Sequence, residues 1–222
     1  SFMIIAVGAD VSRKLNIPGS DKAIGALDFL RKAKCRSSES DVQLDVRVGK
    51  KVVIIGAGNV GCDAATEAHR LGAREITLID IQKPASFGKE RKAAEEIGAK
   101  FLWPVFPKAI HAEGVEMAEG KMLKADTVIV AIGDIPDLSF LPESIQSKRG
   151  YIVVDDLNQT SDSNVYAIGD AVKPGLLTDA IAAGRKVSKV IDARLRGLEQ
   201  SFDQLPVIDY QRIKTEYYNP WL

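Results

Sequence analysis

The sequence has few cysteines, no excess of either charge and no long apolar run. Its two cysteines, Cys35 and Cys62, are too few and too far apart for a structural zinc site or a disulfide framework, which favours a reducing compartment. Lys plus Arg and Asp plus Glu each number 30, so the overall charge does not favour nucleic acid or an anionic membrane as a partner. No run approaches the roughly 18 apolar residues of a membrane span, and the start lacks a signal-peptide pattern. We expect a cytoplasmic protein without a metal site.

Hydrophobic residues make up 45% of the chain, and their pattern predicts an α/β fold. Short apolar runs that stop at glycine or aspartate indicate buried strands of a parallel sheet, with amphipathic helices between them. We expect strands over 3–7, 51–55, 75–79, 100–103, 126–132, 151–154 and 165–168, helices over 25–34, 62–71, 89–97 and about 176–196, and a hairpin or meander over 109–124. Residues 35–48 have the polar composition of a connector.

One glycine motif lies where a nucleotide-binding loop requires it. Gly56, Gly58 and Gly61 form a Gly-x-Gly-x-x-Gly pattern between an apolar strand and an alanine-rich helix. The first glycine allows a tight turn, the second lets the backbone approach a pyrophosphate, and the third lets the helix pack closely. The helix N-terminus then presents free N–H groups and a positive dipole end to the phosphates. The motif predicts a dinucleotide site, and the alternative is a glycine turn that binds nothing.

An acidic residue follows at the distance that the motif predicts. Asp80 ends the next strand, nineteen positions after the last glycine, where a carboxylate accepts hydrogen bonds from the adenosine ribose and repels a 2′-phosphate. No arginine follows directly, since Ile81 and Gln82 come next. We therefore expect NAD(H) in preference to NADP(H). The alternative is that Asp80 is a surface turn residue and that Lys83 and Lys89 hold a phosphate.

Several segments together resemble a known family. Residues 49–73 (GKKVVIIGAGNVGCDAATEAHRLGA) resemble the nucleotide-binding segment of glutamate synthase small-subunit-like flavoproteins, which are FAD- and NAD(P)H-dependent oxidoreductases of the pyridine nucleotide-disulfide oxidoreductase superfamily. Residues 12–19 and 26–34 resemble the segment before that domain, and residues 126–141 the strand and turn where the chain leaves it. Residues 165–188 are similar to the flavin-side signature. Because the segments come in the family order, the resemblance is more specific than any one motif.

The resemblance implies a role for each matched position. The positions that would hold the pyrophosphate of NAD(P) are Gly56, Gly58, Asn59, Val60 and Gly61. Those that would lie beside its nicotinamide half are Ala131, Ile132 and Gly133. Gly169 and Asp170 would meet the flavin at its ribityl–phosphate region, and the helix N-terminus near Thr178 would face the N1–O2 edge of the flavin ring. No catalytic side chain is implied, because the cofactors carry the chemistry.

The chain also departs from the family. Ile81 and Gln82 stand where NADP-dependent members carry arginines, which supports NAD(H). There is no Cys-x-x-Cys pair, so disulfide or thioredoxin reduction is not expected. The N-terminal FAD module of the family is absent, so we expect a piece of a longer protein, with FAD bound by the full-length protein rather than by this chain alone.

The resemblance implies an α/β fold in which a Rossmann-like NAD(P)-binding domain is inserted into a partial FAD-binding domain of the glutathione-reductase-like type. The expected parts are a FAD-domain segment with a linker helix over 1–34, a Rossmann-like NAD(P) domain over 48–130, a second FAD-domain segment over 131–200 and a tail over 201–222. The strand over 3–7 would then pair with a strand among residues 151–200.

The expected function is electron input. NADH would pass a hydride to FAD, and electrons would continue to an iron–sulfur domain or a partner subunit. The alternative is a non-catalytic dinucleotide-binding or sensor module. Residues 165–188 favour the enzyme, because a sensor has no need of a flavin-side signature.

The remaining reactive side chains are expected to be structural. Cys62 stands at a helix start that would stabilise a thiolate, but a free cysteine in such a place is more typically a small packing residue. His69 and His111 have no partner at metal-ligand spacing.

Overall fold

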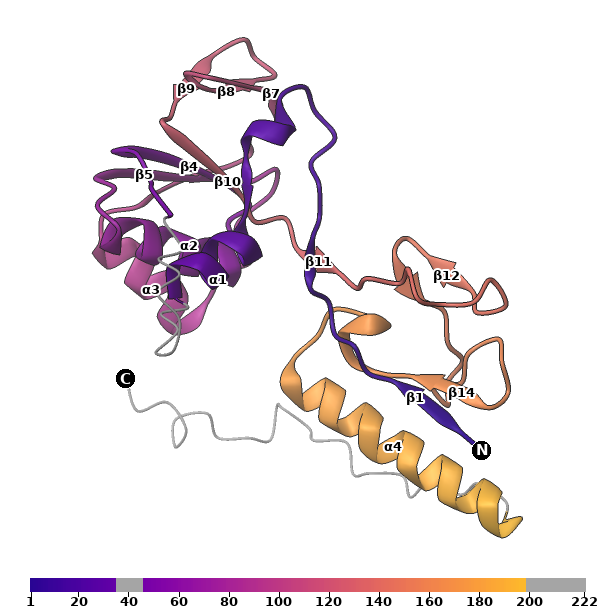
Figure 1. The fold of residues 1–222 in the computed structure, drawn as a ribbon. Coiled ribbons are helices and arrows are strands. Elements are labelled where there is room, and N and C mark those ends of the chain that lie inside the picture. The colour runs from indigo at the N-terminus through magenta and orange to yellow at the C-terminus, as the bar shows by residue number, and fades with distance from the viewer. Residues whose placement is uncertain (35–45, 199–222) are drawn as a thin grey trace, which may run out of the picture.

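The computed structural model describes residues 1–34 and 46–198. Most of the expected connector over 35–48, Cys35 included, and the expected tail over 201–222 lie outside these residues. The described chain forms two bodies (Figure 1). The first body comprises residues 13–34 and 46–133, and the second comprises residues 1–10 and 136–198. Between them run β2 (Val11–Ser12) and β11 (Asp134–Ile135), which pair with each other as antiparallel strands.

The first body is built on a parallel sheet. Within the described residues its strand order is β3 (Ile24–Gly25), β10 (Thr127–Val130), β4 (Lys51–Ile55), β5 (Glu75–Ile79) and β6 (Lys100–Leu102). One face is covered by the helices α1 (Ala26–Lys34), α2 (Asn59–Arg70) and α3 (Gly88–Glu96) (Figure 1). The other face packs against the meander of β7 (Pro107–His111), β8 (Gly114–Met117) and β9 (Met122–Lys124), which confirms the expected meander.

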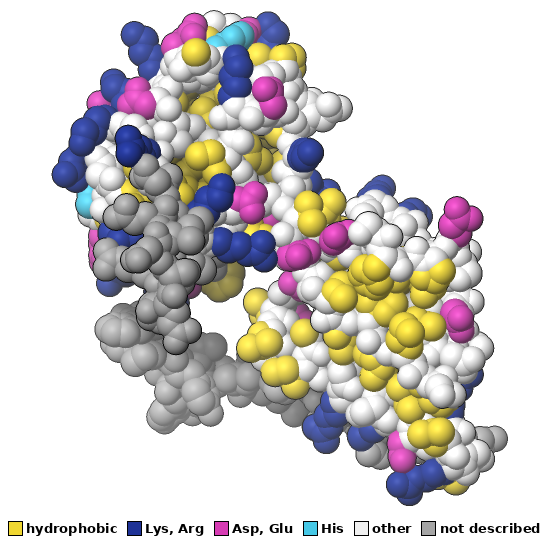
Figure 2. Space-filling view, viewed as in Figure 1, with side chains coloured by type: hydrophobic (Ala, Val, Ile, Leu, Met, Phe, Trp, Pro, Cys, Tyr) yellow, Lys and Arg dark blue, Asp and Glu magenta, His cyan; other side chains and the backbone are white. Residues whose placement is uncertain are grey.

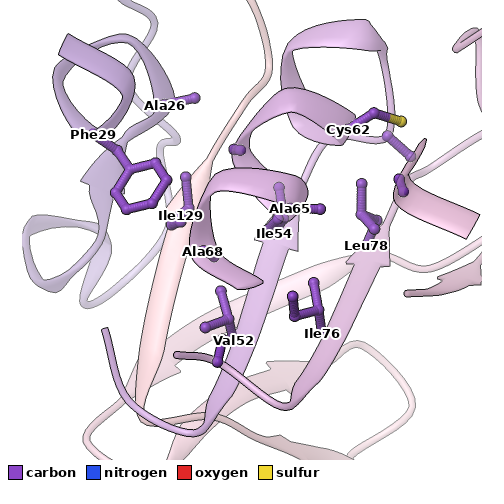
Figure 3. Close-up of a cluster of buried hydrophobic side chains, with 14 residues drawn as sticks. Ala26, Phe29, Val52, Ile54, Cys62, Ala65, Ala68, Ile76, Leu78 and Ile129 are labelled. Carbon is purple, nitrogen blue, oxygen red and sulfur yellow. The ribbon is translucent and has the colours of Figure 1, made fainter. Parts of the chain in front are cut away.

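Alternate residues of each central strand enter different cores. Val52 and Ile54 of β4 pack in the helix-side core, where Phe29 of α1 lies beside Ile129 of β10 (Figure 3). Val53, between them in sequence, packs in the meander-side core. Because both faces of the sheet are covered, the strand is apolar throughout rather than alternating in polarity.

The second body holds a shorter parallel pair. The strand β1 (Met3–Ile5) pairs with β14 (Val165–Ala167), which confirms the expected pairing of the first strand with residues 151–200. Behind β14 lies α4 (Leu177–Arg196), whose Val187 and Val190 pack on Tyr166. The body also contains the hairpin of β12 (Ser147–Lys148) and β13 (Tyr151–Ile152).

The expectation that the first strand is buried is wrong for two of its three residues. Ile5 is buried, but the exposed fractions of Met3 and Ile4 are 60% and 46%. The reason is that β1 pairs with β14 alone among the described strands. Leu177 and Ile181 at the start of α4 are also exposed, and Figure 2 shows hydrophobic side chains gathered on the second body. None of the helices in the described residues is both long and apolar enough to cross a membrane.

Candidate functional site

The glycine motif lies at the carboxyl edge of the first sheet. Because the strands are parallel, the loops that follow β4, β5 and β10 all leave at this edge. The chain winds from β4 through β5 to β6 on one side, whereas β10 and β3 lie on the other side. Open α/β sheets bind ligands outside the carboxyl ends of their strands at such a change of winding direction.

Two of the three glycines are required by close backbone packing. Gly56 has a φ of +109°, and a Cβ there would lie 2.2 Å from the Ala131 carbonyl oxygen. A Cβ on Gly61 would lie 2.2 Å from the Gly56 carbonyl oxygen. A Cβ on Gly58, in contrast, would meet nothing within 4 Å. The loop is therefore held tightly against β10 and α2, and the open space lies over Gly58.

The first turn of α2 borders that open space. Gly58 is the N-cap, and no side chain caps the helix. The N–H groups of Asn59, Val60 and Gly61 have no acceptor within the helix, because they lie in its first turn. The Asn59 side chain turns away to accept a 3.0 Å hydrogen bond from the Phe87 N–H through Oδ1, which ties the motif to the start of α3. The helix N-terminus is therefore free to bind an anion.

Asp80 is fixed against the glycine loop. Its Oδ2 accepts a 2.9 Å hydrogen bond from the Ala57 N–H, and its Oδ1 accepts a 3.2 Å bond from the Gln82 N–H. Each carboxylate oxygen can accept a further bond, because a carboxylate offers about four acceptor sites. The alternative phosphate ligands differ in placement, since Lys83 is exposed and Lys89 Nζ lies 3.9 Å from Glu90 Oε1.

The structure brings residues 131–133 beside the glycine loop. The Ala131 N–H donates a 2.7 Å hydrogen bond to the Ile55 carbonyl, so the end of β10 continues alongside the end of β4. Gly133 has a φ of +95° and open space where a Cβ would be. Its carbonyl accepts a 3.0 Å bond from the Arg13 N–H. The positions expected to hold the two halves of a dinucleotide therefore share one edge of the sheet.

The remaining expected positions lie together in the second body. Asp170 Oδ1 accepts a 3.2 Å hydrogen bond from the Gly175 N–H, and Gly169 has a φ of +64°. Thr178 is exposed in the first turn of α4, where Asp179 Oδ2 accepts a 2.9 Å bond from the Leu176 N–H. A hollow of 330 Å³ is lined here by residues that include Ala6, Gly8, Gly169, Asp170, Leu176 and Ala180.

These residues fit one side of a flavin nucleotide. Gly8 and Gly169 leave backbone close to the hollow, and Asp170 places a carboxylate on its wall. The negative charge of Asp179 lies at the N-terminus of α4, so this terminus is partly neutralised before any ligand binds. The open space over Gly58, the free N–H groups of α2 and the acceptors of Asp80 fit a dinucleotide in the same way.

Cys62 is a packing residue, as expected. Its side chain is fully buried in the helix-side core (Figure 3), and burial raises the pKa of its thiol. On the meander, His111 Nε2 lies 2.9 Å from Glu116 Oε2. In the part of the chain that the structure describes, no three His, Cys, Asp or Glu side chains are grouped so as to hold a metal ion.

The backbone partners of the site carry no side-chain signal in the sequence. The Ala57 N–H and the Phe87 N–H orient Asp80 and Asn59, yet neither residue has a side chain that marks such a role. The motif could have indicated the first, because the residue after its first glycine must face the end of the next strand.

Comparison with solved structures confirms the fold. Over 88% of this chain and 66% of the other, it superposes on thioredoxin reductase of T. acidophilum with a TM-score of 0.69 at 23% identity. An oxidoreductase of the pyridine nucleotide-disulfide family from Enterococcus faecalis V583 gives a TM-score of 0.63 at 24% identity, over 85% and 47% of the chains. The expected α/β architecture is therefore confirmed.

Curated relatives are longer than this chain. The chain is 32% identical to the NADP(+)-dependent formate dehydrogenase subunit beta of Moorella thermoacetica, over 87% of this chain and 32% of the relative. It is 29% identical to rubredoxin-NAD(+) reductase of Pseudomonas putida, over 76% and 45%. It is 31% identical to a protein of Cereibacter sphaeroides named as a small chain of NADPH glutamate synthase, over 85% and 55%. The chain thus spans between a third and about half of these relatives.

The family of this chain is shown by a family model that matches most of its residues. The model described as pyridine nucleotide-disulphide oxidoreductase matches residues 2–184, which include both groups of site residues. Members are flavin-dependent enzymes that use NADH or NADPH, and the names of the relatives include both nucleotides. The chain belongs to the pyridine nucleotide-disulphide oxidoreductase family.

Proposed function

We propose that this chain binds NADH at the carboxyl edge of the first body and presents the nicotinamide to FAD held at the second body. The observation that carries the proposal is the cradle formed by the open space over Gly58, the free first turn of α2 and the oriented carboxylate of Asp80. The pyrophosphate would accept hydrogen bonds from the N–H groups of this turn, where the helix dipole favours negative charge.

The preference for NADH over NADPH rests on Asp80. Its two oxygens keep acceptor sites for the ribose hydroxyls after bonding the N–H groups of Ala57 and Gln82. A 2′-phosphate at the same place would be repelled by the carboxylate. The residues expected to lie beside the nicotinamide, Ala131, Ile132 and Gly133, continue along the same edge.

The role of the second body is to hold and orient the flavin. FAD, when bound, accepts a hydride from NADH and can release electrons one at a time. Gly169 would allow close approach of the backbone, and Asp170 would accept hydrogen bonds from the ribityl chain. Thr178 and the exposed start of α4 would face the flavin ring. The two bodies together would exclude water from the reacting atoms and hold them in contact.

In the whole protein, electrons would pass on to an iron–sulfur domain or a partner subunit in the cytoplasm. Relatives named as a formate dehydrogenase subunit, a rubredoxin reductase and an electron transfer subunit of assimilatory nitrate reductase support such an acceptor. The second candidate is a dinucleotide-binding module without catalysis. Gly169 and Asp170 beside the hollow of the second body favour the enzyme, because nucleotide sensing alone has no use for them.

The test is a calorimetric titration of the purified chain with NADH and then with NADPH at low salt. We expect saturable binding of both, with the smaller dissociation constant for NADH. Asp10→Ser, which removes one negative charge from the second body, serves as the control. This variant should bind NADH as tightly as the original chain does. Absence of NADH binding, with the fold intact, would contradict the proposal.

A further inference from the structure

The hydroxyl of Tyr151 connects the two bodies. Tyr151 lies in β13 of the second body. Its hydroxyl donates a 3.0 Å hydrogen bond to the Asp134 carbonyl in β11, and it accepts a 3.0 Å bond from Arg13 Nη2, which follows β2. One side chain of the second body thus binds both segments that lead into the first body.

Without this contact, the connection that the described residues make between the two bodies is narrow. The segments β2 and β11 pair over two residues each, Val11 with Ile135 and Ser12 with Asp134. Such a short antiparallel ribbon twists easily, because a two-stranded ribbon without a packed face is only marginally stable. Tyr151 adds a third attachment point, which lies outside the axis of the ribbon. The two strands alone leave the bodies free to rotate about that axis, whereas a third point fixes the orientation of one body relative to the other.

The residues that contact Tyr151 also contact the expected nicotinamide position. The Arg13 N–H donates a 3.0 Å hydrogen bond to the Gly133 carbonyl, and Asp134 follows Gly133 in sequence. The Arg13 guanidinium carbon lies 5.9 Å from the centre of the Tyr151 ring. The aromatic side chain therefore holds the end of the 131–133 loop from both sides of the ribbon.

We propose that Tyr151 is a positioning residue, whose hydroxyl fixes the angle between the two bodies and thereby the approach of the nicotinamide to the flavin. This proposal rests on the proposed function, since the angle matters only where each body holds one reactant. Hydride transfer needs the reacting atoms about 3–3.5 Å apart. A rotation of the narrow ribbon would move the distant ends of both bodies by far more than that tolerance.

The test measures the orientation directly and needs no cofactor. Residual dipolar couplings of backbone amides are recorded for the two bodies separately, in the original chain and in Tyr151→Phe. We expect one shared alignment tensor in the original chain, and loss of the shared tensor with weaker alignment of one body in Tyr151→Phe. Arg13→Met, which removes one of the two bonds and leaves the tyrosine in place, is a second variant with a smaller expected effect.

The matched control is Tyr166→Phe. The Tyr166 hydroxyl accepts a 2.6 Å hydrogen bond from Arg194 Nη1, but both residues lie within the second body. This variant loses the same chemical group and should keep the shared tensor. A shared tensor with the original angle between the bodies in Tyr151→Phe, or separate tensors in the original chain, would overturn the proposal.

The proposed function fails separately from this one. NADH titration of Tyr151→Phe should still show saturable binding, because the proposed pyrophosphate and ribose contacts lie in the nucleotide cradle and not at Tyr151. If neither the original chain nor Tyr151→Phe binds NADH while the tensors separate as expected in the variant, the positioning role of Tyr151 is right and the proposed function is wrong. In a longer, flavin-containing form of the protein, Tyr151→Phe should lower kcat for hydride transfer by a larger factor than it raises KM for NADH.

Discussion

The Ala57 N–H donates a 2.9 Å hydrogen bond to Oδ2 of Asp80, so the glycine loop and the end of β5 are locked together. This bond sets the direction of the carboxylate before any nucleotide arrives. It also makes the acid part of the loop structure, since the Gly56 N–H bonds the Ile79 carbonyl one residue earlier. The same pair of strand ends therefore shapes the phosphate cradle and carries the proposed ribose acceptor.

Replacing Asp80 with Ser and Gln82 with Arg should move the nucleotide preference toward NADPH. The double variant removes the charge that repels a 2′-phosphate and adds a guanidinium that can bind it. We expect the ratio of the NADH and NADPH dissociation constants to change by about tenfold or more, which corresponds to roughly 1.4 kcal/mol. Calorimetric titration measures both constants. An unchanged ratio would show that Asp80 does not select the nucleotide.

Alanine at Gly61 should lower mainly stability, whereas alanine at Gly58 should lower mainly NADH affinity. At Gly61 the new Cβ would lie 2.2 Å from the Gly56 carbonyl oxygen, so α2 must shift and the free energy of unfolding should fall by about 1–3 kcal/mol. At Gly58 the new Cβ meets nothing within 4 Å. There stability should change by only about 0.5 kcal/mol, as for a poorer N-cap, whereas NADH affinity should fall because the methyl group enters the cradle.

Urea denaturation and NADH titration of both variants separate these effects. The expectation for the cradle would be wrong if Gly58→Ala bound NADH as tightly as the original chain. Equal stability of the two variants would show that α2 does not depend on the close approach at Gly61.

The thiol of Cys62 should be protected at neutral pH. Its side chain is fully buried and burial raises the pKa, so the native protein holds the protonated form more strongly than the unfolded chain does. Stability should therefore fall as the pH rises from the thiol pKa of the unfolded chain, near the ordinary value of 9.0, toward the raised native value. Below this window the thiol is protonated in both the native and the unfolded chain, so it causes no change of stability with pH.

Alkaline unfolding of the original chain and of Cys62→Ala checks the sign, with Cys35→Ser as the background for thiol labelling. In that background, labelling of Cys62 at pH 7 should be slow and should accelerate with urea. Rapid labelling in the native protein would show that the helix start is open.

The carboxyl of Glu116 should titrate below the ordinary range. Hydrogen bonds from Lys108 and His111 lower its pKa below 4.5. Any stabilisation of the meander by this carboxylate is present above the unfolded pKa and is lost as the pH falls through the lowered native value. The side-chain carbons, followed by NMR during acid titration, report the midpoint, and Lys108→Met together with His111→Gln should raise it. A midpoint unaffected by that double variant would contradict the assignment.

The sequence predicted best those elements that are buried on both faces. The strands over 51–55 and 75–79 match to the residue, because a continuous apolar run with a glycine or aspartate after it leaves little choice of ends. The helix expected from residue 62 begins instead at Asn59. Its first turn is formed by the glycine motif, where packing of backbone against backbone, and not an apolar stripe, makes the helix.

Contacts between distant residues had no pattern from which to be predicted. Phe87 and Asn59 are 28 positions apart, and Arg13 and Tyr151 are 138 apart. The exposure of Met3 and Ile4 was equally hidden, since an apolar run shows that a strand can be buried but not what covers it. The glycine motif and Asp80 could be placed from sequence because their spacing follows from the geometry of one strand–helix–strand unit.

The antiparallel pairing of β2 with β11 brings the entry and exit of the first body side by side. The segment between Ser12 and Asp134 can therefore be regarded as an insertion whose two ends lie next to each other at the second body. A different inserted domain with adjacent ends could replace it without disturbing the pairing of β1 with β14. Nucleotide preference and electron delivery can thus diversify independently within one chain.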